Sequence, residues 1–99
     1  MFQGERYVTK EVMAKIPGFL QNVMWYMIET MEVQNKDYLQ VFNLSQTWED
    51  DQPKQQLIHV QEQPPYHKQH TFSATHPVLA KIFVIDDGTH STMLLADEY

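Results

Sequence analysis

The chain has 99 residues, of which thirteen are Asp or Glu and seven are Lys or Arg, so its formal net charge is −6. This length fits one domain over residues 1–99 with a modest hydrophobic core. The negative charge makes duplex nucleic acid a poor partner, because such binding depends on Lys and Arg displacing counterions. The absence of cysteine excludes disulfides, thiolate metal sites and cysteine nucleophiles.

The N-terminal residues lack the basic and apolar regions of a signal peptide. No window holds the roughly 20 apolar residues that a membrane span needs. The lack of cysteine is consistent with a reducing compartment. We therefore expect a cytoplasmic protein without membrane contact.

The first third of the chain predicts a short strand and a long helix. Residues 6–9 alternate in polarity like a strand, and Thr9 is placed to cap a turn of helix over residues 10–15. Pro17 suits the first position of a main helix that spans roughly residues 17–33. A spacing of about 100° per residue places six apolar side chains on one broad face. They are Ile16, Leu20, Val23, Met24, Met27 and Met31.

The rest of the chain predicts strands. Residues 37–48 and 55–63 form an antiparallel hairpin around a polar, turn-rich loop. Both alternating sets of residues in these strands contain apolar side chains. Residues 67–73, after two prolines, predict only an optional short edge strand. The expected fold is α+β: one long amphipathic helix packed on an antiparallel sheet of about five strands.

The last hairpin is predicted from Asp87-Gly88, which lies between two apolar runs. A type I′ turn needs positive φ at both central residues, and this dipeptide supplies it. A two-residue loop then pairs Asp86 with Thr89. Alternation places six residues on one face of the hairpin: Ile82, Val84, Asp86, Ser91, Met93 and Leu95. Asp86 and His90 point to opposite faces in this register, whereas a three-residue loop would make a dyad of them possible.

Trp25 stands out on the predicted main helix. On the helical projection it lies opposite the apolar face, beside Gln21, Asn22 and Glu29. A tryptophan in a polar stripe is typical of an anchor for a protein partner or a second subunit. The alternative is that the N-terminal strand or the C-terminal tail covers it.

Trp48 precedes three acidic residues, Glu49, Asp50 and Asp51, at the tip of the predicted central hairpin. An acidic loop with an aromatic side chain suits contact with a basic protein surface. It lacks the glycine and the spaced oxygen ligands of an EF-hand loop, so we expect no cation there. A purely solvated loop is the alternative.

Residues that would carry catalysis or hold a cofactor are not evident. The five histidines include His67 and His70, whose spacing fits neither a helical i,i+4 pair nor alternate strand positions. There is no HExxH motif, no glycine-rich phosphate loop and no nucleophile elbow. We therefore predict no catalytic residue, no metal and no cofactor.

Five stretches of the chain match a family that is known only as uncharacterised. They are RYVT (6–9), IPGFLQNVMW (16–25), DYLQVFNL (37–44), IHVQEQPPY (58–66) and VIDDGTHSTMLLADEY (84–99). On these the chain resembles domain of unknown function 960, a family found in low-GC Gram-positive bacteria and often near their phages and mobile elements. The resemblance implies a small cytoplasmic bacterial or prophage protein, and it brings no activity, cofactor or catalytic residue.

Two functions from different classes remain open. The first is a non-enzymatic accessory or interaction protein that binds a protein partner or a second copy of itself through Trp25, Trp48 and the loop 49–51. The second is a small histidine-dependent hydrolase or metalloprotein that uses Asp86, His90 and His59. The hairpin register and the metal content of the purified protein discriminate between them. Direct nucleic-acid binding is a weak third.

Overall fold

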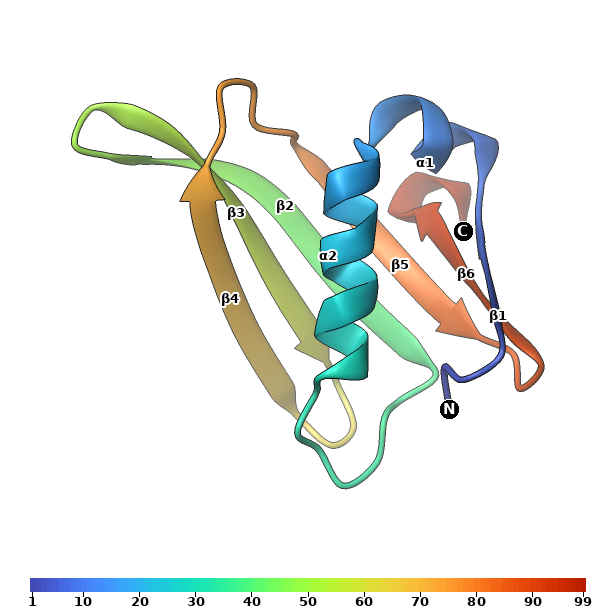
Figure 1. Cartoon of the computed structure of the whole chain (residues 1–99). Coiled ribbons are helices and arrows are strands. Elements are labelled where there is room, and N and C mark those ends of the chain that lie inside the picture. The colour runs from blue at the N-terminus through green and yellow to red at the C-terminus, as the bar shows by residue number, and fades with distance from the viewer.

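A six-stranded sheet with two helices on one face makes up the computed structural model, which describes residues 1–99 (Figure 1). The elements in chain order are β1 (Glu5–Val8), α1 (Lys10–Lys15), α2 (Gly18–Glu29), β2 (Leu39–Glu49), β3 (Gln52–Gln61), β4 (Tyr66–Ser73), β5 (Ala80–Asp86) and β6 (His90–Leu95), followed by a 3₁₀ turn, η1 (Ala96–Glu98).

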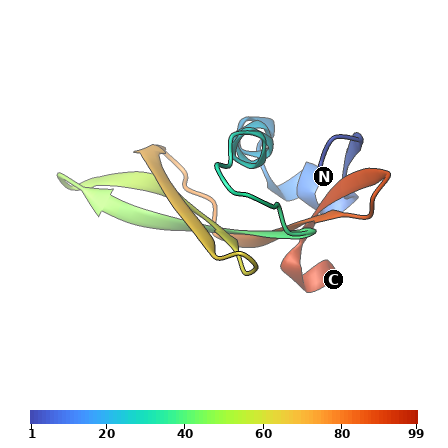
Figure 2. The same cartoon turned by 90° about the horizontal axis from the view of Figure 1, so that it is seen from below.

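The strand order in the sheet is β1-β6-β5-β2-β3-β4. All neighbours are antiparallel except β1 and β6, which are parallel. Both helices and the N-terminal segment lie on one side of the sheet, and η1 lies on the other (Figure 2). We call the second side the open face.

The helical region differs from its prediction in length. The expected turn over residues 10–15 is confirmed, and the Thr9 side chain accepts a hydrogen bond from the Val12 amide at 3.2 Å. The main helix ends at Glu29 rather than near residue 33. The Thr30 hydroxyl donates to the Tyr26 carbonyl, and the Met31 amide bonds to Ile28, which tightens the last turn. Met31 is then buried in the core.

The sheet has six strands where about five were expected. Residues 66–73 form a full edge strand, β4, which pairs with β3 along its whole length from Tyr66–Gln61 to Ser73–Lys54. The Gln63–Pro64 peptide bond before it is cis. The two prolines therefore lie in the turn between two strands and leave the ladder itself intact.

The hydrophobic core lies between α2 and the covered face of the sheet. Leu20, Met24 and Ile28 recur on the inner side of α2 and are almost fully buried. The sheet contributes every second residue of its central strands, including Phe42 and Val84. One helix of twelve residues therefore supplies most of the cover for one face.

Candidate functional site

The hairpin of β2 and β3 extends past the end of β4 and ends in a two-residue turn (Figure 1). Glu49 pairs with Gln52, and the two central residues, Asp50 and Asp51, have φ angles of 52° and 60°. Positive φ at both central positions matches the right-handed twist of the flanking strands. Only glycine takes this conformation freely, and Asp takes it at some cost.

The end of this hairpin gathers an exposed indole and three carboxylates. We call Trp48, Glu49, Asp50 and Asp51 the acidic tip. Trp48 is 62% exposed. None of the ion pairs in the structure includes a carboxylate of the acidic tip. The tip therefore presents an unneutralised negative charge beside a large apolar surface.

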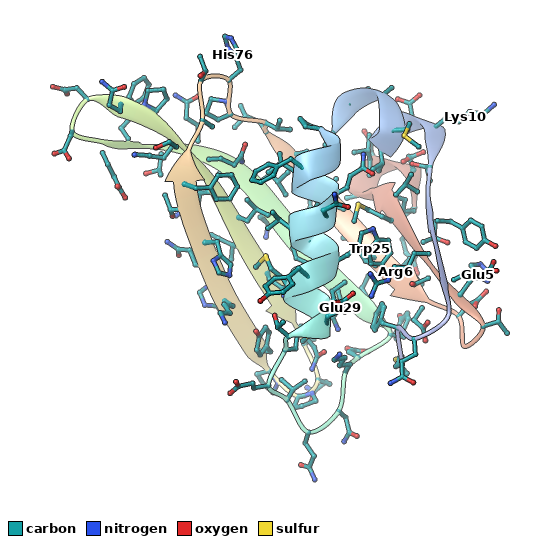
Figure 3. All side chains as sticks on the ribbon, viewed as in Figure 1. Glu5, Arg6, Lys10, Trp25, Glu29 and His76 are labelled. Carbon is teal, nitrogen blue, oxygen red and sulfur yellow. The ribbon has the colours of Figure 1, made fainter.

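Trp25 is buried, which agrees with the expected alternative that the N-terminal strand covers it and not with an exposed anchor. It is 8% exposed and belongs to the hydrophobic core. The guanidinium of Arg6, on β1, lies 4.9 Å from the indole centroid and forms an ion pair with Glu29 at 2.6 Å (Figure 3). The helical projection locates only the sheet-facing side of α2, whereas β1 covers a second side. Trp25 is therefore not part of the exposed surface that could bind a partner.

The β5–β6 hairpin has the predicted faces but not the predicted register. Asp86 pairs with Ser91, two residues away from the expected Thr89. The turn is centred on Gly88 and Thr89, and only Gly88 has a positive φ, 103°. Because a shift of two residues preserves the alternation, the six residues predicted to share a face do so and are all buried. Asp86 and His90 lie on opposite faces and form no dyad.

Asp87, which sequence reasoning assigned to the turn, is the residue that pairs with His90. Its carboxylate lies 3.1 Å from His90 Nδ1 and also accepts the amides of His90 and Thr89. Those amide bonds, first that of His90, lower the pKa of Asp87. The Tyr7 ring packs edge-on against the imidazole at 5.3 Å. The group lies exposed at the β1 edge of the sheet.

His59 belongs to a buried polar network and not to a surface site. Its Nε2 lies 2.7 Å from Gln40 Oε1, and the Gln40 amide donates to Gln61 and to the Asp37 carbonyl. The Gln40 oxygen must accept, so the His59 proton is on Nε2 and the buried Nδ1 has no partner. Burial lowers the pKa of His59 to about 4. A neutral, enclosed imidazole of this kind holds β2, β3 and the loop at residues 35–37 together.

The apolar character of the open face was not predicted from the sequence. The outward positions of the central strands are apolar and only partly buried, and Val60, Val41, Phe83 and Leu94 form one row across β3, β2, β5 and β6. Only the η1 region covers part of it, through Tyr99 packed on Phe83 at 5.5 Å. The signal was present in the sequence, because strands that are apolar on both sides are typical of sheets covered on both faces.

Comparisons with known proteins place the chain in a family. The sequence model of the staphylococcal proteins of unknown function (DUF960) matches residues 5–98, so the chain belongs to that family. A solved protein of unknown function from Enterococcus faecalis is similar, with 24% identity and a TM-score of 0.76, over 97% of this chain and 91% of that one. This likeness shows the fold. No match was found among the curated proteins. Neither helix has the length and apolar content that a membrane crossing needs.

Proposed function

We propose that this member of the DUF960 family is a non-enzymatic accessory protein that binds another protein through the acidic tip. The observation that carries the proposal is the Asp50-Asp51 turn, where two adjacent carboxylates occupy left-handed positions and take part in no ion pair. Asn-Gly is the favoured choice for such a turn. A sequence that departs from the best local choice marks a position selected for something other than stability.

The chemistry of the tip indicates the kind of partner. Trp48 offers a rigid apolar anchor, and the surrounding carboxylates favour a basic protein surface. Long-range attraction between the two surfaces speeds their encounter and weakens with salt. A cytoplasmic location and an origin in a prophage or mobile element are parts of the same proposal, and both rest on the sequence.

Site-specific photo-crosslinking tests the tip. A photoreactive phenylalanine at position 48, in the native host, should capture a partner that the same group at Tyr38 does not capture. Tyr38 is a matched control because it is 50% exposed and immediately precedes the other end of β2. Glu49→Lys with Asp50→Lys should abolish the crosslink, and added salt should weaken it.

Reversal of two distant acids controls for net charge. The double variant Glu32→Lys with Glu62→Lys changes the net charge by the same amount as Glu49→Lys with Asp50→Lys, but away from the hairpin tip. Both Glu32 and Glu62 are exposed. Identical crosslinks from positions 48 and 38, or equal effects of the two reversals, would contradict the proposal.

The Asp87–His90 pair favours a second candidate, a histidine-dependent hydrolase. Asp87 orients Nδ1, which leaves Nε2 available as a general base. His90→Gln should lower hydrolysis of an activated ester about tenfold or more, whereas His76→Gln should not. Equal rates for the two variants would remove this candidate.

A further inference from the structure

Two cavities flank the loop at residues 73–76, at the base of the same hairpin that carries the acidic tip. One has a volume of about 200 Å³ and is lined by Phe19, Phe72 and His76 among others. The other, of about 430 Å³, is lined by Pro53, Lys54 and residues 73–75. Ser73, Ala74 and Thr75 border both, so the two lie next to each other, and we call them the root cavities.

The smaller root cavity has an aromatic wall. Phe19 of α2 and Phe72 of β4 meet edge to face with ring centroids 5.5 Å apart. Phe19 is 62% exposed, whereas Phe72 packs against the core. The cavity is smaller than the roughly 300–1,000 Å³ of small-molecule pockets, and it suits a single inserted side chain. A flat aromatic ring is the natural occupant, because aromatic pairs add packing energy beyond buried area.

The residues that line the root cavities include no carboxylate, in contrast to the tip. Residues 63–81 contain no Asp or Glu, although the chain has thirteen acidic residues. Of the three histidines and two lysines in this stretch, only His76 lines a root cavity. Lys54 lines the larger cavity, where its ammonium donates only to the Ser73 hydroxyl, at 3.0 Å. His76 points outward from the loop (Figure 3).

The acidic tip and the root cavities are complementary and lie at the same end of the molecule. The tip offers an indole next to three carboxylates, and the root offers an aromatic wall, one ammonium from Lys54 and hydrogen-bonding groups such as His76. Lys54 is three residues from Asp51, a span of about 10 Å along a strand. A two-fold axis beside the hairpin would therefore bring each tip to the root of the other copy.

We propose that two copies of this chain form a reciprocal dimer, in which the acidic tip of each docks in the root cavities of the other. Trp48 of one copy packs against Phe19 and Phe72 of the other, and Asp50 and Asp51 approach Lys54 and His76. This inference rests on the proposed function, because it names the partner of the same tip.

Sedimentation velocity over a range of protein concentrations and salt tests the dimer. The wild type should associate, and high salt should weaken the association. The tip reversal, Asp50→Lys with Asp51→Lys, should weaken it about tenfold or more. The root reversal, Lys54→Glu with His76→Glu, should do the same. Glu32→Lys with Glu62→Lys, the net-charge control for the tip reversal, should leave the association unchanged.

A mixture of the two reversed variants gives a readout that a folding defect cannot produce. Each variant should be a monomer alone, but the mixture should dimerise, because both contacts then pair opposite charges. A monomeric wild type, equal effects of the tip reversal and its control, or a mixture that stays monomeric would overturn the dimer. If the wild type is monomeric while position 48 still crosslinks to a different protein, the dimer fails and the proposed function stands. If position 48 captures nothing and the chain is monomeric, both fail.

Discussion

The imidazole of His59 is fully enclosed between Phe42, which stacks on it at 4.3 Å, and the edge of Tyr66. Its hydrogen bond to Gln40 requires a proton on Nε2, which leaves Nδ1 unprotonated in the neutral ring. Protonation of the unpartnered Nδ1 would place a charge in an apolar site without a counterion. The residue that fastens β2 to β3 is therefore also an acid-sensitive point of the fold.

Mild acid should destabilise the protein through His59. Its pKa is about 4 when folded and near 6.5 when unfolded. The unfolded chain therefore binds more protons between these pH values, and stability falls as the pH drops through that window. From pH 7 to pH 5 the loss should be about 2 kcal/mol, measured by urea unfolding.

His59→Gln is the control for this prediction, because glutamine keeps a donor for Gln40 and does not titrate. The variant should be less stable at pH 7 and nearly insensitive to pH between 7 and 5. A slope equal to that of the wild type would assign the pH dependence to other groups.

At the scale of elements, the two aspartates in the turn make the β2–β3 hairpin less stable than an uncharged turn would. Replacing Asp50-Asp51 with Asn-Gly should stabilise the fold by about 1 kcal/mol, because asparagine and glycine tolerate positive φ better and the like charges are removed. The same variant should bind its partner more weakly. Urea unfolding and the crosslink at position 48 measure the two effects. A stabilised variant with unchanged binding would show that the carboxylates do not contact the partner.

The attachment of β1 depends on Gly4. A Cβ at this position would lie 2.1 Å from the Thr89 carbonyl oxygen, which is backbone and cannot rotate away. Gly4→Ala should therefore displace β1, withdraw Arg6 from Trp25 and cost about 1–3 kcal/mol. The emission of Trp25, read in a Trp48→Phe background, should shift to the red.

Gly18→Ala is the matched control, because a Cβ at Gly18 meets nothing within 4 Å. It lies at the start of α2 and should be neutral or stabilising by up to about 1 kcal/mol. If both alanine variants leave the emission of Trp25 unchanged, β1 does not cover the indole as described.

For the whole molecule, the two faces of the sheet should differ in their tolerance of polar groups. Val84 on the covered face is fully buried, and Val41 on the open face is partly exposed. Val84→Thr should cost about 1–3 kcal/mol and Val41→Thr less than about 0.5 kcal/mol, by urea unfolding. Equal costs would indicate that the open face is covered in solution.

Local patterns predicted most of the elements, the faces and the place of the acidic tip, because each depends on residues a few positions apart. They made the main helix too long and left β4 as an optional strand. Alternation assigned the correct side to Asp86 and Ser91 even though their pairing was shifted by two. The shift itself arises because the Asp87 carboxylate caps the turn, a choice that turn propensity alone does not distinguish. The tip was predicted from composition, and its left-handed backbone became visible only in the structure.

Contacts between distant parts of the chain could not be predicted in this way. Cover of Trp25 by the N-terminal strand could be stated only as one alternative. The contact of Arg6 with the indole and the parallel pairing of Glu5 with His90 became visible only in the structure. The root cavities likewise need α2, β3 and β4 together. No periodicity within a segment reports which other segment will lie beside it.

The pairing of the first strand with the last also sets an order of events during synthesis. β1 can complete its ladder only after residues 90–93 have left the ribosome. At translation rates of about 5–20 residues per second, the N-terminal segment waits roughly 5–20 seconds for its neighbour. During that interval Trp25 lacks the cover of Arg6, so a nascent chain exposes an indole that the finished protein encloses.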